Sequence, residues 1–333
     1  MREVTIVQVG VGPIGQRIVE YALQRDGLEL VGAVDPDPEK MGRDLGDVCG
    51  LGRDLDITVA PSLDLVLESC QPQVAVLATT SSIEKATPQI EAIVDRGLHV
   101  VSTCEELAYP WQTAPKLARR LDAAAHRNGV AVLGTGVNPG FLMDLRPLAL
   151  TAICQRVDRI HVSRIQDASI RRIPFQQKIG AGLSLEEFEV KRQAGTLRHV
   201  GLTESIHMIA SRMHWTLDKV EDILTPIVAE AEISTGYTPI AKGMAAGVQQ
   251  IGKGWVGGHE RITLEFRAAI DEPDPRDTVR IEGEPSFEST IPGGINGDVA
   301  TCAIIVNAIE SIVRAPHGLR TMADISPVTF FGS

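Results

Sequence analysis

The sequence lacks the features of a membrane, exported or nucleic-acid-binding protein. It contains no apolar run long enough to span a bilayer. The N-terminus leads directly into a predicted strand, with neither a basic region nor a cleavage signal, so we expect a cytoplasmic protein. Positive charge is scarce, since 32 Lys and Arg stand against 43 Asp and Glu and leave a net charge of −11. This balance argues against a general affinity for nucleic acid or for anionic membranes.

Cysteine is also scarce. The five cysteines are scattered, form no CxxC pair and have no His at ligand spacing. The sequence therefore predicts reduced thiols and no bound metal. These residues are Cys49, Cys70, Cys104, Cys154 and Cys302.

A glycine-rich motif follows an apolar strand at 4–9 and opens an amphipathic helix. Its glycines allow a sharp turn, a close approach of a pyrophosphate and tight packing of the helix on the strand, while the first amides of the helix bind phosphate. Asp35 ends a second apolar run, at the position of a ribose acceptor. The pattern predicts a dinucleotide site, the alternative being a glycine turn in another α/β protein. The residues expected to bind the cofactor here are Gly10, Gly12, Pro13, Ile14, Gly15 and Asp35.

The length of 333 residues is sufficient for two domains. The first part of the chain alternates short apolar strands with amphipathic helices, which is typical of an α/β fold with a parallel, doubly wound sheet. We place this Rossmann domain at 1–140. Its strands are expected at 4–9, 29–34, 56–59, 74–78, 99–102 and 130–133.

The periodicity changes beyond Gly134 to longer strands with alternating polar residues. This pattern predicts a second, α+β domain over 141–333, built on a mainly antiparallel sheet with helices on one face and a partner subunit on the other. We assign substrate binding and dimerisation to it. Its last helix, near 298–314, carries an apolar stripe and is expected to pack back on the first domain. The other elements expected are strands at 157–166, 226–233, 244–252, 260–270 and 277–283 and a helix at 203–213.

Cofactors and reactive groups gather at the carboxyl ends of the strands in such a sheet. Three loops follow these ends, at 79–82, 103–107 and 134–144. Thr79 and Thr80 leave room for a ribose, and Asn138 is expected to hydrogen-bond the nicotinamide carboxamide. The residues expected to line a substrate pocket are Glu106, Pro139, Phe141, Leu142 and Phe175.

Adjacent carboxylates at 105 and 106 are the candidates for acid–base chemistry. Consecutive side chains at a strand end point in different directions, so only one of the two can easily face the nicotinamide, and we assign this catalytic role to Glu105. The alternative for Glu105 is a solvated carboxylate at a helix N-terminus, favoured by the helix dipole. The loops offer no Lys, His pair or Ser-His-Asp order in its place.

A basic, partly apolar loop lies early in the second domain and contains Arg171, Arg172 and Lys178. It is a candidate for closing over substrate or over a cofactor 2′-phosphate. A solvated surface is an equally good interpretation of this loop.

Three segments, Thr103-Cys-Glu-Glu-Leu-Ala-Tyr-Pro110, Gly134-Thr-Gly-Val-Asn-Pro-Gly-Phe141 and Pro292-Gly-Gly-Ile-Asn-Gly-Asp-Val-Ala-Thr301, resemble the 2,4-diaminopentanoate dehydrogenases and related native amine dehydrogenases. These proteins share the dihydrodipicolinate-reductase-like fold, and the resemblance extends over essentially the whole chain. It implies a Rossmann domain, a second domain that dimerises through its sheet, and NAD(P)-dependent oxidative deamination of an amine or its reverse, reductive amination of a carbonyl compound.

The resemblance also carries over to residues. Glu105 matches the catalytic glutamate of the family, in agreement with the choice made above. Asn296 and Thr301 lie in a segment that the family uses near substrate and nicotinamide, so they become pocket candidates. The His-His and Lys signature of the true dihydrodipicolinate reductases has no match in this chain.

Physical chemistry supports a carboxylate in this role. Hydride transfer at a carbon that bears nitrogen passes through an iminium cation, which a carboxylate in an apolar pocket stabilises. NAD is expected as the cofactor in preference to NADP, because Asp35 repels a 2′-phosphate and the following residues are acidic. Lys40 or Arg43, if turned toward the ribose, would reduce this preference.

The leading hypothesis is therefore an NAD(P)-dependent amine dehydrogenase acting on a small amine or a diamino acid. The alternatives are a related reductase of amino-acid metabolism and a regulatory protein that binds NAD without turning it over. The expected partners are the amine or carbonyl substrate and ammonia, with no nucleic acid or membrane, and a second copy of the chain in a homodimer.

Overall fold

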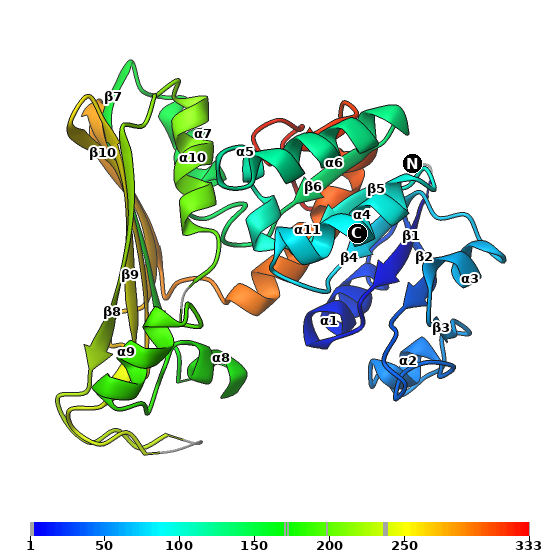
Figure 1. Cartoon of the computed structure of the whole chain (residues 1–333), viewed down its shortest axis with the longest axis horizontal. Helices are drawn as coiled ribbons and strands as arrows, with labels where there is room; N and C mark the ends of the chain where they lie inside the picture. Colours follow the sequence, from blue (N-terminus) through cyan, green and yellow to red (C-terminus); the bar gives the residue numbers. More distant parts are fainter. Residues whose placement is uncertain (1–2, 170, 172, 198, 236–238, 333) are drawn as a thin grey trace. The chain divides into compact units, whose positions relative to one another are not determined.

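The computed structural model describes residues 3–169, 171, 173–197, 199–235 and 239–332. The chain divides into two compact units, which we describe separately: unit 1 comprises residues 1–141 and 296–333, and unit 2 comprises residues 142–295 (Figure 1). The predicted second domain, 141–333, therefore needs correction at its C-terminal end. Residues 296–333 belong to unit 1, because their helix packs on the helices and strands of that unit and their strand joins its sheet.

In the described part of unit 1, seven strands form a sheet in which every neighbouring pair is parallel. The order of the strands reverses between β1 and β4, so the chain winds outward in both directions from this point, where doubly wound folds bind dinucleotides. The α/β fold class expected from the sequence is confirmed. Across the sheet, the strands are β13 (Gly318–Arg320), β6 (Ala131–Gly134), β5 (His99–Ser102), β4 (Val74–Leu77), β1 (Val4–Val9), β2 (Leu28–Val34) and β3 (Val59–Ala60).

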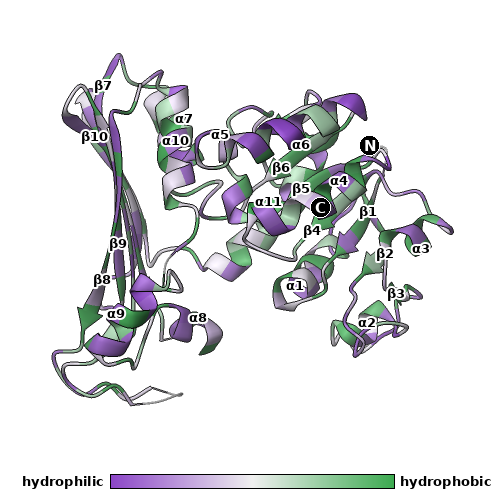
Figure 2. Cartoon of the chain, viewed as in Figure 1, coloured by the Kyte–Doolittle hydropathy of each residue, from purple (hydrophilic) through white to green (hydrophobic). Residues whose placement is uncertain are grey.

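Helices cover this sheet, and its central strand β4 is accordingly apolar on both faces. Figure 2 shows the hydropathy of each residue along the chain. All four residues of β4 are at most 1% exposed. Helix α11 packs against α1 and against strands β4, β5 and β6, although it follows the last of these strands by more than 150 residues. The helices are α1 (Pro13–Ala22), α2 (Leu45–Val48), α3 (Leu63–Leu67), α4 (Ile83–Val94), the 3₁₀ turn η1 (Glu105–Leu107), α5 (Pro110–Thr113), α6 (Pro115–Arg127) and α11 (Gly297–Val313).

Unit 2 is built on a second sheet, which has six strands in the described residues. The sheet is mainly antiparallel, as predicted, with one parallel pair between β7 and β10. The strands in order across it are β12 (Phe287–Pro292), β11 (Arg276–Glu284), β7 (Arg156–Asp167), β10 (His259–Ala269), β9 (Ala245–Val256) and β8 (Lys219–Val228).

The prediction of a strand at 226–233 was wrong in its bounds, because β8 begins at Lys219 and ends at Val228. This strand lies at the edge of the sheet and has no fully buried residue, so charged side chains such as Glu221 and Asp222 interrupt its apolar pattern. Pro226 is tolerated there because an edge strand does not need every amide as a donor. Strand β12, the other edge, was missed for the same reason.

Helices cover one face of the second sheet. Helix α10 packs on β8, β9 and β10, and α7 packs on β7 and β11. Gly252 and Gly254 of β9 permit this close packing, since a Cβ at either position would lie within 3.1 Å of Ile206. The helices of unit 2 are α7 (Leu145–Thr151), α8 (Ile173–Lys178), α9 (Leu185–Gln193) and α10 (Leu202–Arg212). None of the helices in the described residues of the whole chain combines the length and hydropathy needed to cross a bilayer.

A polar network lies across strands β7, β9 and β10 of this sheet. The Glu265 carboxylate accepts hydrogen bonds from Ser163 Oγ at 3.0 Å and Gln249 Nε2 at 2.7 Å, and His161 Nε2 lies 3.9 Å away. His161 above all, together with these two donors, outweighs burial and lowers the pKa of Glu265 to about 2. The network therefore stabilises the ionised carboxylate.

Acid should abolish the contribution of this network to stability. The ordinary pKa of 4.5 in the unfolded chain exceeds the native value of about 2, so the stabilisation is complete above pH 4.5 and is lost as the pH falls toward 2. We expect Glu265→Gln to be less stable than the parent at pH 6, with the two curves converging between pH 4.5 and 2. Urea unfolding at several pH values measures this, and a constant gap over that range would contradict it.

Candidate active site

The glycine-rich loop between β1 and α1 has the geometry that a pyrophosphate requires. Gly10 has φ of +89°, and a Cβ there would lie 2.6 Å from the Ala78 carbonyl oxygen. A Cβ at Gly15 would lie 2.0 Å from the Gly10 carbonyl oxygen, so both positions demand glycine. Gly12 faces open space, with no atom within 4 Å of a Cβ built there, and it caps α1 without any side-chain partner. The first amides of α1 can therefore receive a phosphate.

The end of β2 is tied to this loop through Asp35, which is 8% exposed. Its Oδ2 accepts from the Val11 amide at 2.8 Å and from Lys40 Nζ at 3.1 Å, and its Oδ1 accepts from the Asp37 amide at 3.0 Å. Burial opposes ionisation, but these donors outweigh it and lower the pKa of Asp35. The carboxylate is thus ionised and fixed beside the glycine loop, as an acceptor for ribose hydroxyls must be.

The loop after β4 lies against the same turn, since the Thr79 methyl group would be 2.8 Å from a Cβ at Gly10. Both threonine hydroxyls have protein partners. Thr79 Oγ1 donates to Gln89 Oε1 at 2.9 Å, and Thr80 Oγ1 accepts from the Ser82 amide at 3.2 Å. The structure therefore brings Thr79 to the glycine loop, while contact of either threonine with a cofactor stays a prediction.

The structure distinguishes the two adjacent glutamates of η1. Glu106 Oε2 accepts from the Ile83 amide at 2.9 Å, so this side chain caps the N-terminus of α4. The helix-terminal role considered for Glu105 thus belongs to its neighbour. Glu105 is half-buried and, among the described residues, shows no hydrogen bond from its carboxylate to the protein. Of the two acids, Glu105 is the one whose carboxylate is not assigned to a helix terminus.

The loop after β6 packs on the neighbouring elements of unit 1. A Cβ at Gly134 would lie 2.7 Å from Leu107, which places the end of β6 beside η1. The Val137 amide donates to Thr301 Oγ1 at 3.2 Å, so Thr301 supports the loop. Asn138 is buried and precedes a cis bond to Pro139, and Phe141 is half-buried.

Asn296 has a structural partner as well. Its Oδ1 accepts from the amides of Asp298 and Val299 at 3.0 and 3.2 Å and caps α11. The expected contact of Asn296 with substrate stays a prediction.

The remaining predicted pocket residues belong to unit 2. Leu142 is buried, and the ring of Phe175 lies 4.1 Å below the Arg171 guanidinium carbon. Arg171 Nη1 also donates to Gln166 Oε1 at 3.2 Å, which holds the guanidinium in place. Arg172 lies outside the described residues.

Sequence reasoning missed two supports of the site. Gln8 is buried in β1, and its Nε2 donates to the Gly10 carbonyl oxygen at 2.9 Å, which fixes the glycine turn. Its signal was a polar residue between two valines of the strand. Cys104 is buried beside Glu105 and its Sγ donates to the Ser81 carbonyl oxygen at 3.2 Å. Burial, with Glu105 contributing, raises the pKa of this thiol to about 12, so it stays protonated and cannot serve as the base.

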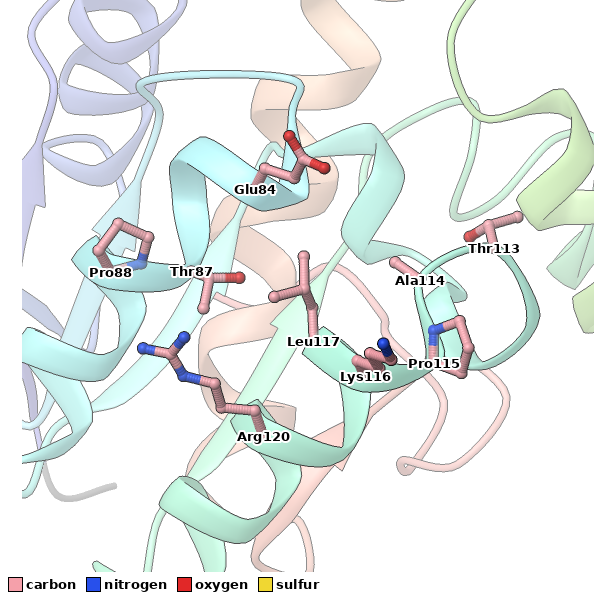
Figure 3. Close-up of a pocket in the computed structure, with 9 residues that line it drawn as sticks. All are labelled: Glu84, Thr87, Pro88, Thr113, Ala114, Pro115, Lys116, Leu117 and Arg120. Carbon is pink, nitrogen blue, oxygen red and sulfur yellow. The ribbon is translucent and has the colours of Figure 1, made fainter.

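A surface cavity of about 750 Å³ lies between α4 and the α5–α6 segment of unit 1 (Figure 3). Thr87 and Leu117 lie between the acidic and basic side chains of its lining. It contains none of the predicted site residues and is therefore a separate feature. Its lining is Glu84, Thr87, Pro88, Thr113, Ala114, Pro115, Lys116, Leu117 and Arg120.

Comparison with known proteins agrees with this geometry. Residues 141–331 match the model of the 2,4-diaminopentanoate dehydrogenase C-terminal domain, and residues 4–104 match the dihydrodipicolinate reductase N-terminus. The 2,4-diaminopentanoate dehydrogenase of Acetoanaerobium sticklandii is 33% identical over 98% of this chain and 94% of its own length. The chain belongs to the 2,4-diaminopentanoate dehydrogenase family.

Two amine dehydrogenases are also similar to this chain. An amine dehydrogenase of Streptomyces virginiae is 25% identical over 97% of this chain and 96% of its own. The solved amine dehydrogenase of Mycobacterium smegmatis superposes with a TM-score of 0.85 at 25% identity, covering 98% of this chain and 97% of its own. The resemblance stated from the sequence is confirmed. This family member is an NAD(P)-dependent oxidoreductase that acts on an amine or amino-acid donor.

Proposed function

We propose that Glu105 is the catalytic carboxylate of an amine dehydrogenase that deaminates a small amine or diamino acid with NAD. The main support for this proposal is the difference between the two acids of η1: the Glu106 carboxylate accepts from the Ile83 amide, and that of Glu105 does not. Glu105 follows β5, at the carboxyl edge of the parallel sheet from which the glycine loop and Thr79 also project. This edge is where doubly wound sheets place their chemistry.

The acid has a distinct task at each step. It first accepts a proton from the substrate ammonium and passes it to solvent, because only the neutral amine can lose hydride from its carbon. When bound, the dinucleotide would supply the oxidation as a hydride acceptor. Glu105, ionised again, stabilises the substrate iminium by its charge and takes a proton from the water that adds to the carbon. It finally returns a proton to nitrogen, so that the C–N bond breaks and ammonium and a carbonyl compound leave; reductive amination is the reverse sequence.

The substrate is proposed from the relatives and from charge. The Acetoanaerobium relative is named for 2,4-diaminopentanoate, which carries a carboxylate. The three strand-end loops of unit 1, at 79–82, 103–107 and 134–141, contain no Lys or Arg to bind such a group. Arg171, held by Gln166 and Phe175, is the candidate cation for it. A plain alkyl amine is the second candidate, supported by Phe141, Leu142 and Phe175.

A substrate panel separates these candidates. NAD reduction at alkaline pH is measured with short amines, amino alcohols, amino acids and diamino acids at matched concentrations. Preference for the diamino acids supports the carboxylate-bearing substrate, and preference for the plain amines refutes it. Absence of NAD or NADP reduction with every amine would contradict the proposed function itself.

Asp35 supports NAD as the preferred cofactor, because its fixed negative charge disfavours a 2′-phosphate. We expect a lower Michaelis constant for NADH than for NADPH in reductive amination. Equal or better efficiency with NADPH would remove this preference.

We also propose a cytoplasmic homodimer. One face of the second sheet is covered by α7 and α10 of the same unit, and its opposite face is the surface proposed for a second copy. No disulfide joins the five cysteines, all of which lie in the described residues, and this suits a reducing compartment. Light scattering coupled to size-exclusion chromatography tests the dimer, and a monomer mass at micromolar concentration would contradict it.

A further inference from the structure

Lys40 holds an unusual place next to the ribose acceptor. Its Nζ lies 3.1 Å from Asp35 Oδ2 and 3.1 Å from Asp37 Oδ2, so one ammonium bridges both carboxylates. The Lys40 side chain is 22% exposed and remains open to solvent. An ammonium has three donors, and the two carboxylates use two of them. Lys40 therefore pairs with the acids and still has a donor for a ligand.

The charges of this cluster decide how strongly it repels a phosphate. Asp35, Asp37 and Lys40 together carry a charge of −1, whereas the two acids without Lys40 carry −2. Burial of Lys40 opposes its charge, but hydrogen bonds to both acids raise its pKa, so it stays protonated at every working pH. A 2′-phosphate attached to a ribose that Asp35 binds would enter the field of this ammonium.

Arg43, the other cation named from the sequence, is directed elsewhere. Its Nη2 donates to Asp47 at 2.7 Å and its Nη1 donates to the Glu39 carbonyl oxygen at 3.0 Å. It forms no contact with Asp35 among the interactions of the described residues. The ammonium that bears on the ribose acceptor is that of Lys40.

We propose that Lys40 determines how far this enzyme discriminates against NADP(H), by neutralising the acids beside the ribose and offering its ammonium to a 2′-phosphate. Asp35 sets the preference for NAD over NADP, and Lys40 limits how large this preference is. This inference rests on the proposed cofactor site at Asp35. It predicts that the enzyme uses both NAD(H) and NADP(H), and that the charge of Lys40 controls the ratio of their dissociation constants.

The test is binding, measured without turnover. Titration of the protein with NADH and with NADPH, followed by dihydronicotinamide fluorescence, yields a Kd for each. We expect Lys40→Gln to raise the Kd for NADPH about tenfold and to change that for NADH less than about twofold. Added salt should weaken NADPH binding more in the parent than in Lys40→Gln, because the phosphate contact that salt screens is already lost in the variant.

A second variant moves the ratio the opposite way. Asp37→Asn removes one of the two acids that Lys40 neutralises, so we expect NADPH to bind several-fold tighter and NADH to be unaffected. Arg43→Gln is the matched control, since it removes the same charge three residues further along the chain. It should change both constants by less than about twofold.

The outcomes are separable. Equal weakening of both cofactors by Lys40→Gln, or a selective loss of NADPH in Arg43→Gln instead, would overturn the role of Lys40. Asp35→Asn is titrated alongside. If that variant binds NADH as tightly as the parent, the proposed cofactor site is itself wrong and the inference falls with it.

Discussion

Replacing Glu105 with Gln is expected to lower kcat for amine-dependent NAD reduction by about 10³-fold or more, because it removes both the base and the charge that stabilises the iminium. The Kd for NADH should change less than about twofold, since the proposed dinucleotide contacts are at the glycine loop and Asp35. Stopped-flow measurement of hydride transfer separates the chemical step from product release. A retained rate would exclude Glu105 as the catalytic carboxylate.

A matched control accompanies this variant. Glu84→Gln removes an exposed acid on α4 outside the proposed site. It should retain the parental rate, which shows that loss of one acid is not enough to inactivate the protein.

Replacing Asp277 with Leu is expected to lower the free energy of unfolding by about 3–5 kcal/mol, the usual cost of leaving one member of a buried ion pair unpaired. Arg164 and Asp277 are each 2% exposed, and Arg164 Nη1 donates to Asp277 Oδ1 at 2.9 Å. The second carboxylate oxygen accepts from the Ile295 amide at 2.7 Å, and Arg164 Nη2 donates to the Ile295 carbonyl oxygen at 3.0 Å. Burial already lowers the pKa of Arg164 to about 10, a sign of how unfavourable an unpaired guanidinium would be here.

A double variant distinguishes the charge from the packing. Arg164→Met combined with Asp277→Leu removes both charges and should be more stable than Asp277→Leu alone. Chemical denaturation of the parent and the two variants measures this. A double variant that is less stable than the single one would show that the residues act through shape and hydrogen bonds to Ile295 rather than as an ion pair.

Much of the fold was predictable because its signals are short-range. The alternation of apolar strands and amphipathic helices located β1, β2, β4, β5 and β6 within about two residues. The edge strands β8 and β12 were harder, since an edge strand buries little and its residues need not alternate. The short helices α8 and α9 escaped notice for a similar reason, because α9 has one buried residue and α8 has one, too few to form an apolar stripe.

The site divides in the same way. The roles of the glycines at 10, 12 and 15 could be predicted from the sequence, because they depend on local geometry: a sharp turn, the approach of a pyrophosphate and the close packing of a helix on a strand. The sequence also identified the two adjacent acids as a pair. Their separation into a helix cap and a candidate base depends on the Ile83 amide, which lies 23 residues earlier and meets Glu106 only when α4 and η1 pack together.

The sequence alone thus predicted the dinucleotide loop, the parallel sheet and the family, since the signals for all three lie in residues that are neighbours along the chain. Packing in three dimensions assigned the partners of Glu106, Lys40 and Asp277. Hydrogen bonds and ion pairs act over about 3 Å, and a pair such as Arg164 and Asp277, 113 positions apart, is brought within that range only when β7 and β11 lie side by side.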